Sequence, residues 1–338
     1  MDINQIFVSL KMDAVCISDI TGDNSHFYEI KLGPELTLNK FRAAVGELNF
    51  RLGSEHPPFL EVIPSSGVVR LQVIKSLPDD IDLITSSQRG LVSRSDFYLG
   101  KSYLGKPVAI NMLENSNVLL AGTTGSGKSV ALHTIIANSL LKNEPVEIFL
   151  GDSKLVEFKS YDHLPQVSCV AQSYLDHLAM LDTVQSIMEN RFEMLQQAKL
   201  THAEKIPALP RILVVIDEIA DLIVQDRNHD WEFQTKMIAI AQKCRAAGIS
   251  LVIATQRPSV NIISGIIKAN FPTRIACRVS SKADSRVILD APGAESLLGR
   301  GDAIIDSREN SKVRFKFAAT SIANLFEYLR LPVPDLKG

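Results

Sequence analysis

Two patterns of apolar residues divide the chain. Up to about residue 110, short apolar runs alternate with turn-forming residues, which is typical of strands in a small α+β unit. Apolar residues at helical spacing predict one helix there, over Leu36–Leu52. No group of residues in this part suggests chemistry, so we expect a structural or oligomerisation role. The predicted strands are Val8–Leu10, Phe27–Leu32, Phe59–Ile63 and Val68–Ile74.

From Ser116 onward, almost entirely aliphatic runs alternate with helical stripes, including helices expected at Lys128–Leu141 and Ser321–Arg330. Such strands are typical of a mostly parallel sheet that helices cover on both faces. We therefore predict an α/β fold in two parts, a small α+β domain at 1–95 and a larger domain at 96–338, with a loop-like Thr85–Ser95 between them. The predicted strands of the larger domain are Val118–Ala121, Val146–Leu150, Ile212–Ile216, Ser250–Thr255, Arg274–Val279, Ala303–Asp306 and Val313–Phe317.

A phosphate-binding loop follows the first of these aliphatic strands. The segment fits the pattern GxxxxGK[ST], in which glycines let successive backbone N–H groups face the phosphates. Lys128 is placed to reach the β- and γ-phosphates of ATP, and the Ser129 hydroxyl to bind Mg²⁺. The helix that follows directs its positive end at the same charge. The loop residues are Gly122, Thr123, Thr124, Gly125, Ser126, Gly127, Lys128 and Ser129.

Polar side chains follow three further aliphatic strands. Asp217 and Glu218 end one of them, and we expect Asp217 to hold Mg²⁺ and Glu218 to activate the attacking water. Gln256 ends another strand, where an amide can sense the γ-phosphate or the water; a simple polar cap of the strand is the alternative. Asp152 ends a third, with Lys154 and Glu157 following it, and we weigh support of the site equally against local ion pairing.

Phosphoryl transfer also requires positive charge that an arginine from a neighbouring subunit can supply. Arg245 lies near a helix end, just before the strand that Gln256 follows. Physical reasoning alone does not prefer it to Arg191 or Arg257, because a basic residue in a last helical turn also stabilises the helix dipole.

Composition narrows the class of protein. A net charge of −2 provides no overall basic field, so any surface that binds nucleic acid has to be local. The four cysteines show no CxxC spacing, and we interpret them as reduced thiols of a cytoplasmic protein. No apolar run approaches the roughly 18 residues of a membrane span, and no signal peptide is visible, so we expect no membrane insertion.

Several segments together resemble the FtsK/SpoIIIE motor ATPases over roughly Asp96–Asp306, and residues 1–95 resemble the family's smaller α domain more loosely. The resemblance implies a RecA-like fold, a homo-hexameric ring, and ATP-driven translocation of double-stranded DNA through its pore. The matching segments are Leu119–Ser129, Asp217-Glu218, Lys243–Gly248, Ala254–Val260, Gly265–Asn270, Pro272–Arg274, Ser280–Leu289 and Gly293–Gly299.

The resemblance assigns roles residue by residue. Lys128 and Ser129 match the Walker A lysine and hydroxyl, and Asp217 and Glu218 the Walker B pair. Arg245 matches the family's trans-acting arginine, a choice that physical reasoning left open. Four basic positions match the pore loops that grip the DNA backbone, where contacts go to phosphates and carry no sequence information. They are Arg257, Lys268, Lys282 and Arg286.

The chain also departs from the family. Its bacterial division proteins have an N-terminal membrane region and a long linker, and we expect neither here, because no apolar run approaches the length of a membrane span. They also end in a winged-helix domain that reads DNA orientation sequences, which we do not expect here, because the chain stops at Gly338. This compact form resembles stand-alone motors of mobile elements, and equally a motor core cut from a longer protein. Arg300 stands where the family has an uncharged residue, and we assign it no role.

Three functions compete at this point. The first is a DNA-translocating ATPase. The second is a DNA-packaging or DNA-transfer ATPase that works with a portal, a channel or a recruiting protein. The third is an ATP-switched module that binds DNA without translocation, which Glu218 and Arg245 disfavour because a switch needs fast hydrolysis less.

Overall fold

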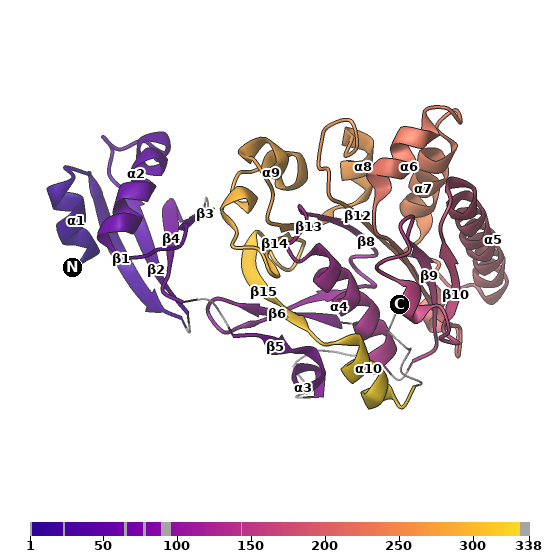
Figure 1. Ribbon diagram of the computed structural model, residues 1–338. Coiled ribbons are helices and arrows are strands. Elements are labelled where there is room, and N and C mark those ends of the chain that lie inside the picture. Colours follow the sequence, from indigo (N-terminus) through magenta and orange to yellow (C-terminus); the bar gives the residue numbers. More distant parts are fainter. Residues whose placement is uncertain are drawn as a thin grey trace.

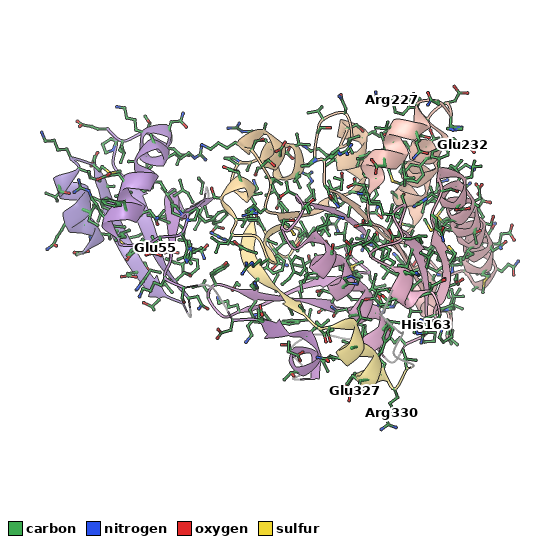
Figure 2. All side chains as sticks on the ribbon, viewed as in Figure 1. Glu55, His163, Arg227, Glu232, Glu327 and Arg330 are labelled. Atoms are coloured by element: carbon green, nitrogen blue, oxygen red, sulfur yellow. The ribbon has the colours of Figure 1, made fainter. Side chains whose placement is uncertain are left out.

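The computed structural model describes residues 2–22, 24–63, 66–76, 79–88, 96–142 and 144–331. These residues form two sheets, a four-stranded one near the N-terminus and an eleven-stranded one that makes up most of the molecule (Figure 1). Figure 2 shows Glu55 of the smaller part and Arg227 of the larger part at opposite ends of the view. Of the predicted loop at Thr85–Ser95, residues 85–88 instead belong to a helix, α3 (Leu83–Gln88), and residues 89–95 lie outside the described residues.

The N-terminal unit, residues 2–76, packs two helices on one face of an antiparallel sheet with strand order β1-β2-β4-β3. Ile6, Phe7, Phe41 and Leu48 of the helices are buried against Ile30 of the sheet. The elements are α1 (Ile3–Ser9), β1 (Ala14–Thr21), β2 (Ser25–Leu32), α2 (Leu38–Arg51), β3 (Phe59–Ile63) and β4 (Val68–Ile74).

The strand predicted at Val8–Leu10 is wrong, because this segment ends the helix α1. Ile3, Ile6 and Phe7 are the buried residues of α1, and their spacing is that of one helical face. The side chain of Asp2 accepts a hydrogen bond from the Asn4 N–H (3.2 Å) and so caps the helix. The cap at Asp2 and the helical spacing of Ile3, Ile6 and Phe7 start the helix, and the apolar run at Val8–Leu10 continues it to its end.

The large sheet has the order β10-β9-β11-β12-β8-β13-β14-β15-β6-β7, with β5 paired to β15. Strands from β10 to β13 are parallel, and β14, β15, β6 and β7 continue the sheet with antiparallel pairs. The bounds are β5 (Ile81–Asp82), β6 (Asp96–Ser102), β7 (Pro107–Asn111), β8 (Asn117–Ala121), β9 (Val146–Gly151), β10 (Val167–Ala171), β11 (Arg211–Ile216), β12 (Ile249–Thr255), β13 (Thr273–Cys277), β14 (Asp302–Asp306) and β15 (Val313–Ala319).

Helices cover both faces of this sheet, as the aliphatic strands predicted. Along β11, Ile212 and Val214 face the core that contains α5 to α9, whereas Leu213 and Val215 face the core that contains α4 and α10. The strands are therefore apolar on both sides, which explains why they do not alternate with polar residues. The helices are α3 (Leu83–Gln88), α4 (Lys128–Leu141), α5 (Tyr174–Ala198), α6 (Ile219–Asp226), α7 (Glu232–Lys243), α8 (Gly265–Asn270), α9 (Lys282–Leu289) and α10 (Ile322–Leu329).

The N-terminal unit contacts the large sheet through aromatic and apolar side chains. Phe27 and Tyr103 are buried together with Ile74. The guanidinium of Arg314 on β15 lies over the rings of Phe59 (5.9 Å) and Tyr103 (5.1 Å). β5, which the predicted boundary at residue 95 assigns to the small domain, pairs with β15 of the large sheet; the division into domains stays a prediction.

Candidate nucleotide-binding and catalytic site

The phosphate loop joins β8 to α4, and α4 begins at Lys128 as predicted. Gly125 (φ +74°) and Gly127 (φ +104°) adopt the left-handed conformation that glycine tolerates. A Cβ on Gly127 would lie 2.2 Å from the backbone nitrogen of Gly301, so glycine is also required there for space. The loop therefore curls around the N-terminus of a fourteen-residue helix, which is an arrangement suited to phosphate.

A turn at 299–302 supports the phosphate loop from behind. The Gly301 N–H donates to the Ser126 carbonyl (3.0 Å), and the Arg300 N–H donates to the Gly125 carbonyl (3.4 Å). In the same turn, Asp302 forms a buried bidentate ion pair with Arg314, with distances of 3.1 Å to Nε and 2.7 Å to Nη2. The backbone of Arg300, rather than its charge, thus contacts the site.

The order of strands brings Asp217, Glu218 and Gln256 to the same edge of the sheet as the phosphate loop. β12 lies between β8, which precedes the phosphate loop, and β11, which precedes Asp217 and Glu218. Parallel strands end at the same edge, so Gln256 after β12 stands between the two halves of the site. Its Oε1 accepts a hydrogen bond from the Thr124 hydroxyl of the phosphate loop (3.2 Å).

Lys128 and Asp217 form a buried ion pair. The Lys128 ammonium also donates to the Asp217 carbonyl (2.9 Å). Burial raises the pKa of the Asp217 carboxyl, and the charge of Lys128 opposes that rise. A nucleotide phosphate would exchange one anionic partner of the lysine for another and free the Asp217 carboxylate.

Glu218 is buried and accepts three hydrogen bonds from its neighbours. Its Oε1 accepts hydrogen bonds from the Thr255 hydroxyl (2.7 Å) and the Ala220 N–H (3.1 Å), and its Oε2 from the Gln256 N–H (2.8 Å). The contact with Ala220 makes Glu218 the N-cap of α6. The carboxylate is therefore held in one orientation at the carboxyl edge of the sheet.

The donor set fits a magnesium nucleotide. The Ser126 hydroxyl is buried with no hydrogen-bond partner in the described part of the chain, so it is available to a ligand. Ser129 and Asp217 would supply oxygen ligands to Mg²⁺, which keeps most of its coordination for water and phosphate. Among the described residues, no group of three or more His, Cys, Asp or Glu side chains is placed to hold a metal ion by itself.

Glu157 belongs to this site and was not predicted as a site residue. The Ser129 hydroxyl donates to its Oε1 (2.7 Å), and His133 lies 3.6 Å from its Oε2. The neighbouring His133 lowers the pKa of Glu157 most, with burial acting against it and the hydrogen bond from Ser129 adding to the lowering. Its only sequence signal was its place, five residues after Asp152 in the segment that follows β9.

Asp152 organises the backbone of that segment. Its Oδ2 accepts from the N–H groups of Glu157 and Phe158 (2.9 Å each), and its Oδ1 from the Lys154 N–H (3.2 Å). The side chain is almost fully buried. Of the two alternatives for Asp152, these backbone contacts favour support of the site, because they place Glu157 beside Ser129.

Arg245 lies at the opposite edge of the sheet from the phosphate loop. It follows α7, just before β12, and pairs with Glu114, which Arg308 also approaches (3.8 Å). β12 has seven residues, and a strand rises about 3.3 Å per residue, so the two edges are about 20 Å apart. Arg191, an alternative from the sequence, is buried and donates to the Ala247 (2.7 Å) and Pro210 (2.6 Å) carbonyls.

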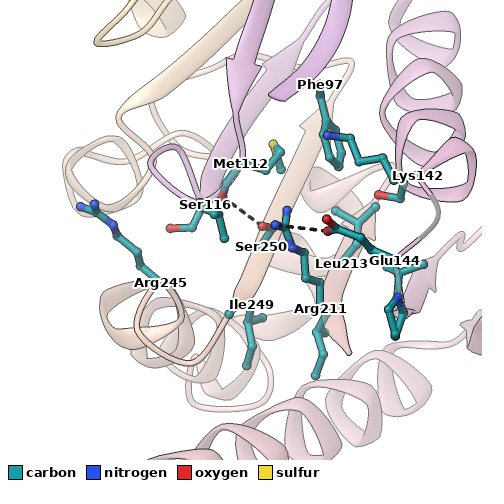
Figure 3. A pocket seen from close by; sticks show the side chains of 16 residues that line it. Phe97, Met112, Ser116, Lys142, Glu144, Arg211, Leu213, Arg245, Ile249 and Ser250 are labelled. Atoms are coloured by element: carbon teal, nitrogen blue, oxygen red, sulfur yellow. Dashed lines mark hydrogen bonds and ion pairs between the residues drawn. The ribbon is translucent and has the colours of Figure 1, made fainter. Parts of the chain in front are cut away.

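A pocket adjoins Arg245 at this edge, among the amino ends of β9, β11 and β12 (Figure 3). Lys142 lies there with its ammonium over the Phe97 ring (4.9 Å), and burial lowers the pKa of Lys142 to about 8. Arg211 pairs with Glu144 (3.3 Å). The pocket is separate from the phosphate loop, and its lining is mostly apolar with these charges at its rim.

The four basic residues predicted to contact DNA lie on neighbouring elements beyond the catalytic edge. Arg257 directly follows β12 and its side chain is 75% exposed. Lys282 and Arg286 are exposed on α9, and α8 and α9 lie along one edge of the molecule (Figure 1). Lys268 on α8 differs, because it is half-buried and shares Asp290 with Arg274.

The sheet, the phosphate loop and the two carboxylates after β11 define a P-loop ATPase fold of the RecA-like type. The FtsK/SpoIIIE family profile matches residues 88–208 and 198–260, and the chain belongs to the FtsK/SpoIIIE family. Among the described residues, no helix has both the length and the apolar character needed to cross a bilayer.

Relatives and solved structures agree with this assignment. The chain is 33% identical to the DNA translocase FtsK of Chlorobaculum tepidum over 89% of its own length, and 36% identical to the DNA translocase SftA of Bacillus subtilis over 82%. It spans only 40% and 31% of those two proteins. Its fold is similar to that of the pCW3 conjugation coupling protein TcpA with ATPγS, with a TM-score of 0.69, 20% identity and coverage of 96% and 97% of the two chains. A second similar fold is the cytoplasmic domain of the Thermomonospora curvata type VII secretion ATPase EccC, with a TM-score of 0.59, 22% identity and coverage of 71% of this chain and 32% of that one.

Proposed function

We propose that this protein is an ATP-driven translocase of double-stranded DNA. The observation that carries the proposal is the path of β12, whose end lies between the phosphate loop and Glu218 and continues directly into exposed Arg257. One short segment thus joins the centre of hydrolysis to a basic surface. Relatives that match most of this chain are named DNA translocases, which supports DNA as the substrate.

In this proposal each site residue has one task. Lys128 binds the β- and γ-phosphates, and Ser129 and Asp217 hold Mg²⁺, which would neutralise charge on the phosphates when bound. Glu218 accepts a proton from the attacking water, and Gln256 contacts the water or the γ-phosphate. The remaining loop residues supply backbone N–H groups to the phosphates.

The position of Arg245 supports a ring. Because it lies about 20 Å from the phosphate loop of its own chain, it can reach a nucleotide only in a neighbouring subunit whose carboxyl edge faces this amino edge. Head-to-tail contacts of this kind close into rings, and we propose a homo-hexamer. Arg257, Lys268, Lys282 and Arg286 of each subunit then line a basic channel for the DNA backbone.

A second candidate is a cytoplasmic ATPase for DNA transfer or packaging that works with a membrane channel or a portal. The similarity in fold to a conjugation coupling protein along nearly the whole of both chains favours it. The chemistry of the site is the same, so the two candidates differ in the partner and not in the reaction.

The test is steady-state ATP hydrolysis with and without long linear double-stranded DNA at two salt concentrations, with Lys128→Ala as the blank. We expect strong stimulation that fades as salt rises, because contacts with phosphates release counterions. Displacement of a DNA triplex then measures movement directly. Hydrolysis that is indifferent to DNA would contradict the translocase, and stimulation without triplex displacement would favour the switch.

Two variants separate hydrolysis from DNA contact. Glu218→Gln should bind ATP and hydrolyse it at least about 100-fold more slowly, as expected when a general base is lost.

Replacement of Arg257, Lys268, Lys282 and Arg286 by alanine should remove stimulation by DNA and leave basal turnover unchanged. Full stimulation in the second variant would refute the DNA-binding assignment alone.

A further inference from the structure

The hydroxyl of Thr255 connects the catalytic carboxylate to the segment that carries Arg257. Thr255 is the last residue of β12 and is fully buried. Its Oγ1 donates to Glu218 Oε1 (2.7 Å) and accepts from the Arg257 N–H (3.0 Å). A single side-chain atom therefore touches both the predicted base and the first residue of the predicted DNA contact.

The hydrogen bonds of Glu218 leave one direction for the attacking water. A carboxylate has about four lone-pair positions. Three are used by the Thr255 hydroxyl and the N–H groups of Ala220 and Gln256, two on Oε1 and one on Oε2. The remaining position is on Oε2, so these three donors determine where the base can accept a proton.

We propose that Thr255 is a positioning residue that orients Glu218 and couples its orientation to the path of the chain at Arg257. The inference rests on the proposed function and deepens it. A shift of the Arg257 backbone towards DNA changes the hydrogen bond to Thr255 Oγ1, and the same hydroxyl transmits the change to Glu218. Contact of Arg257 with DNA thereby alters the orientation of Glu218, although the DNA does not touch this carboxylate.

A hydroxyl is required for this role, and packing is not enough. Valine has the shape of threonine but neither donates nor accepts, so it removes both links at once. Serine keeps the hydroxyl and loses only a methyl group. Thr255→Val and Thr255→Ser therefore separate the positioning role from a role in the core, which valine would satisfy better than serine.

The first test is ATP hydrolysis by both variants, with and without double-stranded DNA. For Thr255→Val we expect kcat to fall at least tenfold, the KM for ATP to stay within twofold, and the ratio of DNA-stimulated to basal kcat to fall at least fivefold. Thr255→Ser should keep both quantities within threefold of the unaltered chain. Unchanged kcat and stimulation in Thr255→Val, or an equal loss in Thr255→Ser, would overturn the proposal.

A double variant shows whether Thr255 acts through Glu218. In a Glu218→Gln background, adding Thr255→Val should lower the residual kcat by less than twofold, because the group that Thr255 orients is already inactive. A further tenfold loss would mean that Thr255 acts elsewhere and would refute the role.

Amide hydrogen exchange tests the link without hydrolysis. Thr255→Val removes the acceptor of the Arg257 N–H, so exchange at Arg257 should speed up at least tenfold, and Thr255→Ser should leave it unchanged. Absence of that difference overturns the link even if the unaltered chain proves to be an active, DNA-stimulated ATPase. If the chain shows no DNA-stimulated hydrolysis, the proposed function fails, and the exchange result still decides whether the connection exists.

Discussion

At the scale of single residues, the two functional side chains of the phosphate loop are each held by a carboxylate from another strand. Lys128 pairs with Asp217 after β11, and the Ser129 hydroxyl donates to Glu157 after β9 (2.7 Å). Both carboxylates occupy directions in which phosphate and Mg²⁺ would be held. Binding of a magnesium nucleotide would therefore exchange Asp217 for phosphate at Lys128 and Glu157 for Mg²⁺ at Ser129.

Glu157→Gln should weaken the binding of Mg²⁺ at the phosphate loop and leave other properties intact. The negative charge of Glu157 beside Ser129 favours the cation, and loss of a carboxylate next to a metal ligand costs roughly tenfold in metal affinity. We expect the Mg²⁺ concentration for half-maximal hydrolysis at constant ATP to rise about tenfold. The matched control is Glu147→Gln on β9, whose carboxylate accepts only an exposed hydrogen bond from Ser168 (2.7 Å). Equal Mg²⁺ requirements in the two variants would contradict the role of Glu157.

At the scale of elements, a buried aspartate organises the connection between α6 and α7. Asp226 has no exposed surface and accepts from the Tyr174 hydroxyl (2.6 Å) and from the N–H groups of Phe233 (2.8 Å) and Gln234 (3.0 Å). It thus binds the start of α5 to the start of α7. These helices cover the face of the sheet next to the catalytic strands (Figure 1).

Asp226→Ala should lower the free energy of unfolding by about 3 kcal/mol or more, since three buried donors lose their acceptor. Denaturation in urea measures this. Asp182→Ala provides the control, because its exposed ion pair with Lys236 should contribute at most about 1 kcal/mol. A loss of similar size in both variants would show that the three hydrogen bonds of Asp226 contribute little.

A buried histidine makes α5 sensitive to acid. His177 is fully buried, with Nδ1 2.7 Å from the Ser173 carbonyl and Nε2 close to Gly151. Burial lowers the pKa of His177 from 6.5, while Ser173, Asp176 and Asp152 oppose the shift. The unfolded chain consequently binds more protons below about pH 6.5, and stability falls as the pH decreases through that range.

Urea unfolding at pH 7.5 and 5.5 checks this prediction. We expect the acidic sample to be less stable by up to about 1.4 kcal/mol for each pH unit below 6.5. His177→Gln should reduce this difference, since glutamine does not titrate. The same difference in both proteins would assign the acid sensitivity to another group.

The elements differ in how far the sequence could predict them. β11 and β4 could be predicted because buried strands require aliphatic residues on one or both faces. α1 was missed because its cap at Asp2 and its spaced apolar residues are a weaker signal than the run at Val8–Leu10. β6 and β7 were not predicted as strands. Gly100 and Lys101 interrupt the apolar pattern of β6, which pairing with β15 stabilises instead, and β7 pairs with β6.

The same distinction holds for the site. Asp217 and Gln256 directly follow β11 and β12, and Lys128 follows the loop after β8, so the parallel order of these strands is enough to bring the three together. Glu157 depends on the fold of a loop that Asp152 organises through backbone hydrogen bonds, which no spacing specifies. The role proposed for Arg245 requires a second subunit, so no single chain could decide it.

At the scale of the whole molecule, the proposed ring makes the two edges of the large sheet complementary halves of one reaction centre. The phosphate loop and Glu218 lie at the carboxyl edge, and Arg245, paired with Glu114, lies at the amino edge. A subunit by itself therefore holds an incomplete set of charges. In the proposed ring, a neighbouring subunit supplies the missing arginine, and this contact separates Arg245 from Glu114.

Mixing two inactive variants tests this arrangement. Arg245→Ala keeps an intact phosphate site, and Glu218→Gln keeps an intact arginine, so each alone should hydrolyse ATP at least about 100-fold more slowly than the unaltered chain. Mixed rings contain interfaces in which both intact parts meet, and we expect turnover to recover to a tenth or more of the normal rate. Arg308→Ala, which removes the other arginine near Glu114, should remain active. No recovery in the mixture, despite confirmed subunit exchange, would contradict an arginine that acts between subunits.

The turn behind the phosphate loop has a mechanical consequence. Its backbone supports Ser126 through Gly301, and its Asp302 is fastened to Arg314, which lies over Phe59 of the N-terminal unit. A force on the N-terminal unit would thus be transmitted through these contacts to the phosphate loop at Ser126. Force on the N-terminal unit and binding of the nucleotide at the phosphate loop should therefore be coupled through these contacts.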